Sequence, residues 1–211
     1  MEDPANYAYA DHELHPDPPH QPLYLAKMLH HLKADPSIRR VLDAGCGDGN
    51  FAASISESGY EVYGLDMSDS GVRLAQARNV GTFRKGSVYD PLAGPFAGVD
   101  SFDAIYAVEV TEHLYSPRIF AKGAYEALRP GGRLIVTTPY WGYLKNVALA
   151  ITGRLDRNLT ALWDGGHIKH WSRKTLTTLM EEQGFEVIGF EGAGRACYLY
   201  KGMMLISRKP G

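Results

Sequence analysis

Residues 41–49 read VLDAGCGDG, a short apolar run that passes directly into three glycines spaced two residues apart. The apolar part is typical of a buried strand, and the residues from position 50 onward have the spacing of a helix. Glycines between a strand and a helix let the backbone approach a ligand closely, and the start of the helix contributes N–H donors. The segment therefore predicts a ligand-binding loop at the carboxyl end of the first strand of a sheet.

The rest of the chain alternates short apolar runs with amphipathic stretches. Strands are predicted over 40–44, 61–65, 81–88, 102–108 and 133–138, and helices over 23–32, 50–58, 70–78, 116–128 and 173–183. Strands that alternate with helices at this spacing form crossover units in a mostly parallel sheet. The last two predicted strands, 185–190 and 198–206, are joined by a loop too short for a crossover helix, which favours an antiparallel hairpin at the sheet edge. The pattern predicts the α/β class.

Length and composition fit one globular domain. The chain has 211 residues, and its 22 Lys and Arg against 24 Asp and Glu give a charge of −2, which excludes a protein built to coat nucleic acid. The longest uncharged run, 134–144, is too short for a transmembrane segment, and no secretory signal begins the chain. With only Cys46 and Cys197, we predict a reduced, cytoplasmic compartment. We expect a mobile N-terminal arm over 1–21 and a single domain over 22–211, with an insertion at 140–166.

Glycine spacing separates this loop from a dinucleotide-binding loop. The dinucleotide motif has its third glycine three residues after the second, whereas Gly45, Gly47 and Gly49 are each two apart. Asp43 precedes them, and no phosphate-loop Lys-Ser/Thr pair follows. The second predicted strand ends at Asp66, where a ribose diol lies in folds of this kind, although a carboxylate there also suits a helix N-cap. The loop therefore favours a nucleoside-containing ligand other than a dinucleotide.

The segment GSVYD, residues 86–90, ends the third predicted strand with a polar and then an apolar side chain, an order suited to the edge of an adenine ring. With the loop, Asp66 and the LRPGG turn at 128–132, the sequence resembles the class I S-adenosylmethionine-dependent methyltransferases over residues 38–139. The resemblance implies a Rossmann-like seven-stranded sheet, mostly parallel, with helices on both faces and a C-terminal antiparallel hairpin, together with bound S-adenosyl-L-methionine and methyl transfer. The cofactor contacts that it implies are Asp43, Gly45, Cys46, Gly47, Gly49, Asp66, Met67, Ser87, Val88 and Val108.

The fourth predicted strand continues into EVTEH, residues 109–113, which marks a candidate acceptor site. If a helix begins there, Glu109, Glu112 and His113 stand at i, i+3 and i+4 on one face, at the edge where open α/β sheets bind ligands. Two carboxylates and an imidazole suit a divalent ion such as Mg or Mn, and His167 or His170 offers a further ligand. Such an ion lowers the pKa of an acceptor hydroxyl; without it, His113 or His167 becomes the candidate general base.

A narrower resemblance supports the metal-site hypothesis. The Glu-x-x-Glu-His segment, the Thr-Pro pair at 138–139 and a later His are similar to the ubiquinone-biosynthesis O-methyltransferases and the small-RNA 3′-terminal 2′-O-methyltransferases. In those families the matching residues hold a divalent metal that binds the acceptor hydroxyls. The match around residues 171–173 favours His167 over His170. The ligands that this resemblance implies are Glu109, Glu112, His113 and His167. A Glu-His pair also starts a helix in methyltransferases of this class that have no metal.

We predict an enzyme that O-methylates a small molecule, such as a phenol, catechol, sugar or lipid-linked acceptor, in a pocket capped by the insertion. Tyr140, Trp141 and Tyr143 either line an aromatic acceptor pocket or belong to the core. The basic residues of the insertion indicate either a solvated face or peripheral membrane contact. Alternatives are an N-methyltransferase of a small amine, a 2′-O-methyltransferase acting on RNA ends, which the lack of a basic stripe disfavours, a non-catalytic cofactor sensor, and a nicotinamide-dependent oxidoreductase. The sequence predicts no oligomeric state.

Overall fold

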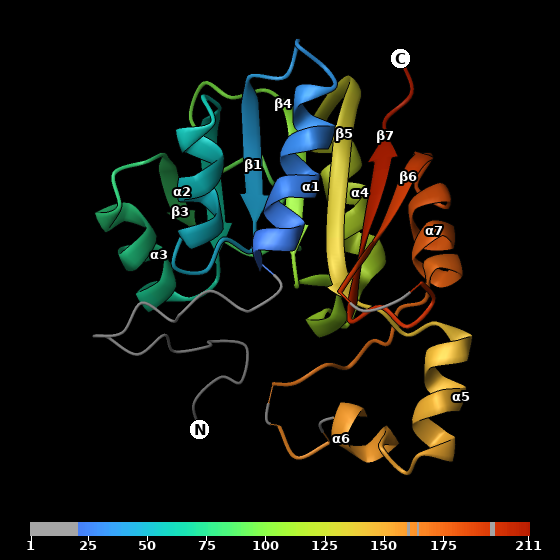
Figure 1. Ribbon diagram of the computed structural model, residues 1–211. Helices are drawn as coiled ribbons and strands as arrows, with labels where there is room; N and C mark the ends of the chain where they lie inside the picture. Colours follow the sequence, from blue (N-terminus) through green and yellow to red (C-terminus); the bar gives the residue numbers. More distant parts are fainter. Residues whose placement is uncertain (1–20, 160, 164, 195–196) are drawn as a thin grey trace.

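Seven strands form one sheet, in the order β3-β2-β1-β4-β5-β7-β6, in the computed structural model (Figure 1), which describes residues 21–159, 161–163, 165–194 and 197–211. The strands are β1 (Arg40–Ala44), β2 (Glu61–Asp66), β3 (Thr82–Lys85), β4 (Phe102–Val108), β5 (Leu128–Pro139), β6 (Glu186–Ala193) and β7 (Gly202–Arg208). β7 pairs antiparallel with both β5 and β6, and the other neighbouring pairs are parallel. The predicted fold class is therefore confirmed, including the antiparallel hairpin.

Helices cover both faces of the sheet. One face carries α1 (Gln21–Lys33), α2 (Asn50–Glu57) and α3 (Asp69–Ala77), whose buried side chains share one hydrophobic cluster. The other face carries α4 (Pro117–Ala127) and α7 (Arg173–Glu181). The insertion contains α5 (Tyr143–Ile151) and α6 (Leu155–Leu159), which lie beyond the carboxyl ends of the parallel strands (Figure 1). The insertion thus stands at the edge of the sheet where the predicted site residues gather.

Successive side chains of each strand point to opposite sides of the sheet, and because helices cover both sides, both sets of side chains are buried. In β1, Val41 belongs to the cluster beneath α1 and α2, while Leu42 belongs to the cluster beneath α4 and α7. Leu134 and Ile135 in β5 divide in the same way. This period of two explains why the strands read as continuous apolar runs in the sequence.

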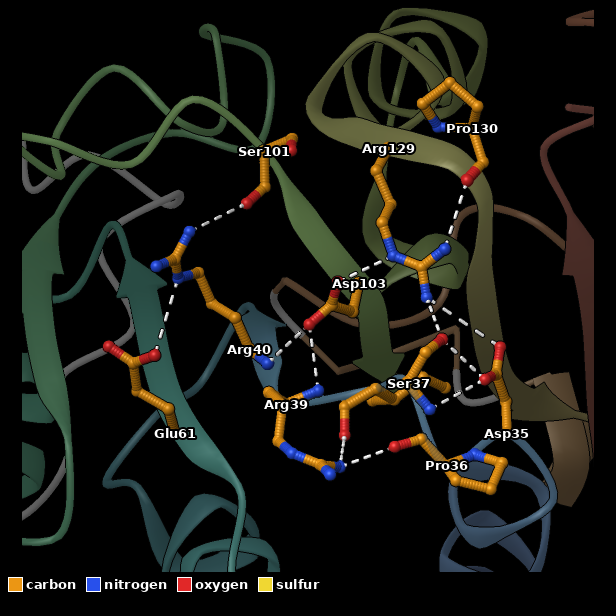
Figure 2. A network of polar contacts seen from close by, with 11 residues as sticks. Asp35, Pro36, Ser37, Arg39, Arg40, Glu61, Ser101, Asp103, Arg129 and Pro130 are labelled. Carbon is orange, nitrogen blue, oxygen red and sulfur yellow. Dashed lines mark hydrogen bonds and ion pairs between the residues drawn. The ribbon is translucent and has the colours of Figure 1, made fainter.

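One carboxylate joins three segments at the opposite edge, where the parallel strands begin (Figure 2). Asp103 of β4 accepts hydrogen bonds from the backbone N–H groups of Arg39 and Arg40, each at 2.8 Å. It also accepts one from Arg129 Nε at 2.6 Å, and Arg129 in turn donates to Ser37 Oγ at 2.6 Å. The network holds the ends of β1, β4 and β5 in register far from the candidate site.

Several element boundaries differ from the prediction. The strand predicted over 81–88 ends at Lys85, and Gly86 instead donates its N–H to the Asp66 carbonyl at 3.0 Å. β5 begins at Leu128 rather than 133, because Leu128 pairs with Phe102 before an irregularity in the register. β6 extends to Ala193, beyond its predicted end at 190, and β7 begins only at Gly202, so residues 198–201 precede it.

Two further predictions concern the ends of the chain and the membrane. The expected mobile arm, 1–21, lies outside the described residues except for residue 21, which begins α1. Among the helices of the described ranges, none combines the length and the apolar character that crossing a membrane requires.

Candidate functional site

The glycine loop between β1 and α2 adopts backbone conformations that glycine alone adopts easily. Gly45, Gly47 and Gly49 have φ angles of 85°, 50° and 75°. A Cβ at Gly45 would stand 2.6 Å from Val110 Cγ2, and one at Gly49 would stand 2.8 Å from the Cβ of a residue in α3. The predicted loop therefore needs these glycines for two separate reasons, left-handed backbone and close packing.

Asp66, at the end of β2, joins the loop to the start of α3. Its Oδ2 accepts the Gly47 N–H at 2.9 Å and its Oδ1 accepts the Ser68 N–H at 2.8 Å. The N-cap of α3 is Ser68, whose hydroxyl accepts the Gly71 N–H at 3.2 Å, so Asp66 is not that cap. Burial raises the pKa of Asp66. Each oxygen retains a second lone pair, which is available to a ligand hydroxyl.

A second carboxylate lies beneath the loop. Asp43 is almost entirely buried, and burial raises its pKa well above the ordinary value, with the neighbouring Asp66 acting in the same direction. A hydrogen bond from Tyr106 of β4 opposes this rise. Cys46 is also buried, and burial raises the pKa of its thiol, so the contribution of Cys46 to the loop is through its backbone. Its N–H donates to the Leu65 carbonyl at 3.0 Å.

The remaining predicted cofactor contacts follow the ends of neighbouring strands. Met67 comes directly after β2 and is partly exposed, and Val108 ends β4. Val88 packs in the core, while the Ser87 hydroxyl accepts the Tyr89 N–H at 3.1 Å. These side chains therefore surround the carboxyl edge near the glycine loop, and their contacts with a cofactor stay a prediction.

No α-helix begins at Glu109, so the condition under which Glu109, Glu112 and His113 would share one helical face is not met. Only a 3-10 turn, η1 (Thr111–His113), forms, and Glu109 precedes it with a left-handed φ of 56°. Thr137 of β5 imposes this backbone, because its carbonyl and its Oγ1 each accept the Glu109 N–H at 3.2 Å. The Thr137 hydroxyl also donates to Glu109 Oε1 at 3.2 Å. Glu109 is thus directed by β5 rather than by helical spacing.

The two carboxylates of the segment differ in exposure, since Glu112 is buried and Glu109 is half-buried. The Glu112 side chain is 1% exposed, and neither of its oxygens has a hydrogen-bond partner of good geometry among the described residues. Burial raises the pKa of Glu109 to about 7, and it raises that of Glu112 well above the ordinary value, to which the charge of Glu109 adds. Two neighbouring acids whose pKa values are both raised favour sharing one proton.

Two imidazoles complete the cluster. His167 Nε2 lies 4.0 Å from Glu112 Oε1, and the His113 and His167 rings have their centroids 5.0 Å apart. The N–H groups of Ile168 and Lys169 both donate to the Glu112 carbonyl at 2.9 Å, which holds the His167 segment against η1. Burial lowers the pKa of both histidines, that of His167 to about 4, so both are neutral at pH 7.

The structure brings together three of the four predicted metal ligands. One donor atom from each of Glu112, His113 and His167 lies within 4.8 Å of the others. Glu109 contacts Glu112 but is not part of this group of three. His170 is separate, with its ring set edge-on to Trp141 at 4.2 Å between centroids. The arrangement distinguishes His167 from His170, which the spacing of residues alone did not.

Sequence reasoning missed Tyr24 and Thr137. Tyr24 belongs to α1 and is buried, and burial raises the pKa of its phenol, to which the charges of Glu109 and Glu112 add. No local motif identifies either residue, since each acquires its role only when a distant segment packs beside Glu109. Of the aromatic residues in question, Trp141 and Tyr143 line a pocket, whereas Tyr140 packs in the core.

The sheet order, the glycine loop and the carboxylate at the end of β2 define an α/β enzyme that binds a nucleoside-containing cofactor at its carboxyl edge. The chain belongs to the methyltransferase domain family, whose model matches residues 19–189. Membership of this family implies S-adenosylmethionine as the methyl donor.

Relatives and solved structures agree with this assignment. A "probable S-adenosylmethionine-dependent methyltransferase" of Mycolicibacterium smegmatis is 35% identical over 163 residues, 75% of this chain and 58% of the relative. A ubiquinone biosynthesis O-methyltransferase of Xanthomonas axonopodis is 33% identical over 131 residues, 58% of this chain and 54% of the relative. The magnesium protoporphyrin IX methyltransferase of Synechocystis, with bound S-adenosylhomocysteine, shares the fold at a TM-score of 0.66, with 20% identity over 90% of this chain and 83% of that one. The matches thus span little more than half of either curated relative.

Proposed function

We propose that the enzyme transfers a methyl group to a hydroxyl of a small molecule held at Glu112, His113 and His167. The observation that carries the proposal is the convergence of these three donor groups within 4.8 Å, beside the half-buried Glu109 carboxylate and at the edge where the glycine loop lies. Such a cluster recognises a hydroxyl, which donates a hydrogen bond and must lose its proton. A neutral amine already has its lone pair available, so its methylation does not require such a cluster.

The acids of the candidate site can accept the proton that the acceptor hydroxyl loses during methyl transfer. The acceptor oxygen forms a bond to the methyl carbon while the carbon–sulfur bond of the sulfonium breaks, which leaves neutral S-adenosylhomocysteine. The hydroxyl proton must pass to the protein or to solvent. Glu109, with a pKa raised to about 7 by burial, is matched to accepting that proton near neutral pH. The predicted histidine bases are less suitable, because a pKa of about 4 makes His167 a weak base.

The residues also fit the divalent ion that the narrower resemblance implies. One carboxylate and two imidazoles are a mixed oxygen and nitrogen donor set, and the histidines are neutral, as metal ligation requires. Glu112 keeps both oxygens without partners of good geometry among the described side chains. We therefore propose Glu112, His113 and His167 as ligands, with Glu109 beside them. When bound, a Mg or Mn ion supplies the lowering of the hydroxyl pKa and fixes the acceptor.

A pocket next to the cluster supports an acceptor with an apolar part. It has a volume of about 450 Å³ and lies between Trp141, His170 and the aliphatic side chains of α5 and α6. His170 follows His167 by three residues, so a chain segment of at most about 10 Å joins the pocket to the cluster. Ligand pockets commonly combine apolar walls with a few polar groups at one end. A phenol, a catechol or a lipid-linked acceptor has this chemistry.

The outer face of α5 supports peripheral contact with a membrane or with a lipid-linked acceptor. Tyr143, Leu144 and Ile151 are exposed apolar side chains on this helix, beyond the carboxyl edge of the sheet. Amphipathic helices of this kind bury an apolar face at an interface.

The two cysteines are free, which accords with the predicted reducing cytoplasmic environment.

The proposal is tested by calorimetric titration of S-adenosylhomocysteine into the chelator-treated chain, repeated with Mg²⁺ or Mn²⁺ alone. We expect cofactor-product binding in every case, and metal uptake that Glu112→Ala abolishes and His170→Ala, the matched control, retains. A radiolabelled methyl screen over catechols, phenols, sugars, amines and RNA ends then identifies the acceptor. Labelling of catechols or phenols supports the proposal, whereas labelling confined to amines or to RNA ends refutes it.

A further inference from the structure

The side chain of Arg78, at the carboxyl end of α3, is hydrogen-bonded to one residue of the glycine loop. Its Nε donates to the Asp48 carbonyl at 2.7 Å, and its Nη2 donates to Asp48 Oδ2 at 2.8 Å. The other oxygen of this carboxylate, Oδ1, accepts the Asn50 N–H at 3.1 Å. Both partners are largely withdrawn from solvent, with 18% of the Arg78 side chain and 14% of the Asp48 side chain exposed. One guanidinium therefore holds both the main chain and the side chain of Asp48.

The position of Asp48 in the loop makes this contact important. Asp48 lies between Gly47 and Gly49, whose φ angles are both left-handed. Glycine has more backbone freedom than any other residue, so a segment of this kind loses much conformational entropy when it is ordered. A loop that its own protein already holds in place loses less of that entropy when a ligand binds, and the ligand binds more tightly for this reason.

The loop is also in contact with α3 at other points. A Cβ at Gly49 would stand 2.8 Å from the Ala75 Cβ, so no side chain fits between the helix and the loop. In front of the helix, Asp66 accepts the Gly47 N–H at 2.9 Å. The loop is thus held both by the residue that ends β2 and by the residue that caps the carboxyl end of α3.

A guanidinium is suited to this double contact. It is planar and presents several N–H donors in a fixed arrangement, so it can bind a carbonyl and a carboxylate together, whereas an ammonium group is a compact point charge. The pair formed by Arg118 and Glu182 has the same donors, with Nε at 2.6 Å and Nη2 at 3.1 Å from the carboxylate oxygens, but it lies on the exposed surface. Exposed ion pairs of this kind contribute little.

We propose that Arg78 is a positioning residue for the methyl donor, because it keeps the glycine loop in its binding conformation through Asp48. The inference depends on the predicted role of the loop in cofactor binding and does not depend on the acceptor. A methyl screen that yields no O-methylated product would therefore refute the proposed function and leave this inference standing.

The test compares Arg78→Ala and Arg78→Lys with Arg118→Ala, the matched control, in the full chain. Calorimetric titration measures the dissociation constant of S-adenosylhomocysteine, and urea unfolding verifies that each variant is folded. A contact with a purely structural role would change stability and leave the affinity of the folded molecules unchanged. We expect the dissociation constant to rise at least ten-fold in Arg78→Ala, at least three-fold in Arg78→Lys, which cannot hold the carbonyl and the carboxylate together, and less than two-fold in Arg118→Ala.

A second measurement isolates the contact between the two side chains. Asp48→Ala should raise the dissociation constant at least three-fold, and it replaces Arg78→Ala as the deciding variant if Arg78→Ala does not fold. The double-mutant cycle of the two substitutions should show at least three-fold coupling in this constant. A value within two-fold of the wild type in the deciding variant, or coupling below two-fold, overturns the inference. If the wild type does not bind S-adenosylhomocysteine, the predicted cofactor loop is wrong and the inference fails with it.

Discussion

Replacing Gly45 by alanine tests whether the cofactor loop and the acceptor turn depend on one close contact. Gly45 has a φ of 85°, and an added Cβ would meet Val110 Cγ2 at 2.6 Å. Val110 stands between Glu109 and Glu112, so a shift of its backbone moves both carboxylates. Gly59→Ala is the natural control, because Gly59 has a φ of 91° and a Cβ there would have no neighbour within 4 Å.

The two substitutions separate backbone strain from the steric clash. Forcing a residue with a Cβ into left-handed backbone costs roughly 1–2 kcal/mol, and this cost applies at both positions. Inserting a methyl group into a close-packed region costs about 1–3 kcal/mol more, and this cost applies only at Gly45. We therefore expect Gly59→Ala to lower the free energy of unfolding by about 1–2 kcal/mol and Gly45→Ala by about 2–5 kcal/mol.

Urea unfolding of both variants, with and without saturating S-adenosylhomocysteine, measures these differences. Gly45→Ala should also weaken product binding at least ten-fold, whereas Gly59→Ala should leave it unchanged. Adding Val110→Ala to Gly45→Ala removes the clashing methyl group and should restore part of the binding. Equal destabilisation by the two glycine substitutions, or no recovery in the double variant, would refute the reasoning.

Three further predictions follow from burial and charge. Glu112→Gln should stabilise the fold by about 1–3 kcal/mol at pH 8 and by less at pH 4.5 in urea unfolding, because a buried acid with a raised pKa loses stability as the pH rises above its unfolded value. Asp103→Asn should cost about 1–3 kcal/mol at pH 7, and the difference should shrink as the pH falls below 3.8, since hydrogen bonds and Arg129 lower the pKa of Asp103 and its contribution is lost on protonation. A thiol-alkylating reagent should label Cys197 and spare buried Cys46 in the native chain, and mass spectrometry of the peptides measures both.

The sheet was predictable because its information is local. Apolar runs such as 102–108 and 133–138 are buried on both faces, and each strand end carries a glycine, an acid or a polar turn. The predicted strand boundaries were wrong where a contact with a distant segment lies at the end of the strand. Leu128 joins β5 because Phe102 pairs with it, and residues 198–201 precede β7, where the Tyr200 ring lies against Gly192. Neither contact can be predicted from the residues beside the boundary.

The candidate site likewise contains residues that the local sequence indicated and one residue whose geometry depends on a distant segment. Residue type and strand-end position were enough to indicate Asp66 and the glycine loop, since both belong to segments whose ends meet at the sheet edge. Residue type left His167 and His170 as alternatives, and the resemblance favoured His167, which the structure places near Glu112 and His113. Residue type and strand-end position were not enough for the geometry of Glu109, because its left-handed backbone depends on Thr137, 28 positions later in the chain. Helical spacing was the wrong rule for a segment whose hydrogen bonds go to a neighbouring strand.

Methyl transfer requires donor and acceptor to be aligned within about 3–3.5 Å, and under the proposed function this demand falls on the contact between the glycine loop and the turn that carries Glu112. Gly45 of the glycine loop packs against Val110, and Glu109 is held from β5 by Thr137. A left-handed glutamate and a buried carboxylate oppose stability, and so they persist only because the surrounding strands over-determine them. Under the proposed function, the positions at which this chain departs from simple sequence rules are those that we expect to align the acceptor with the methyl group.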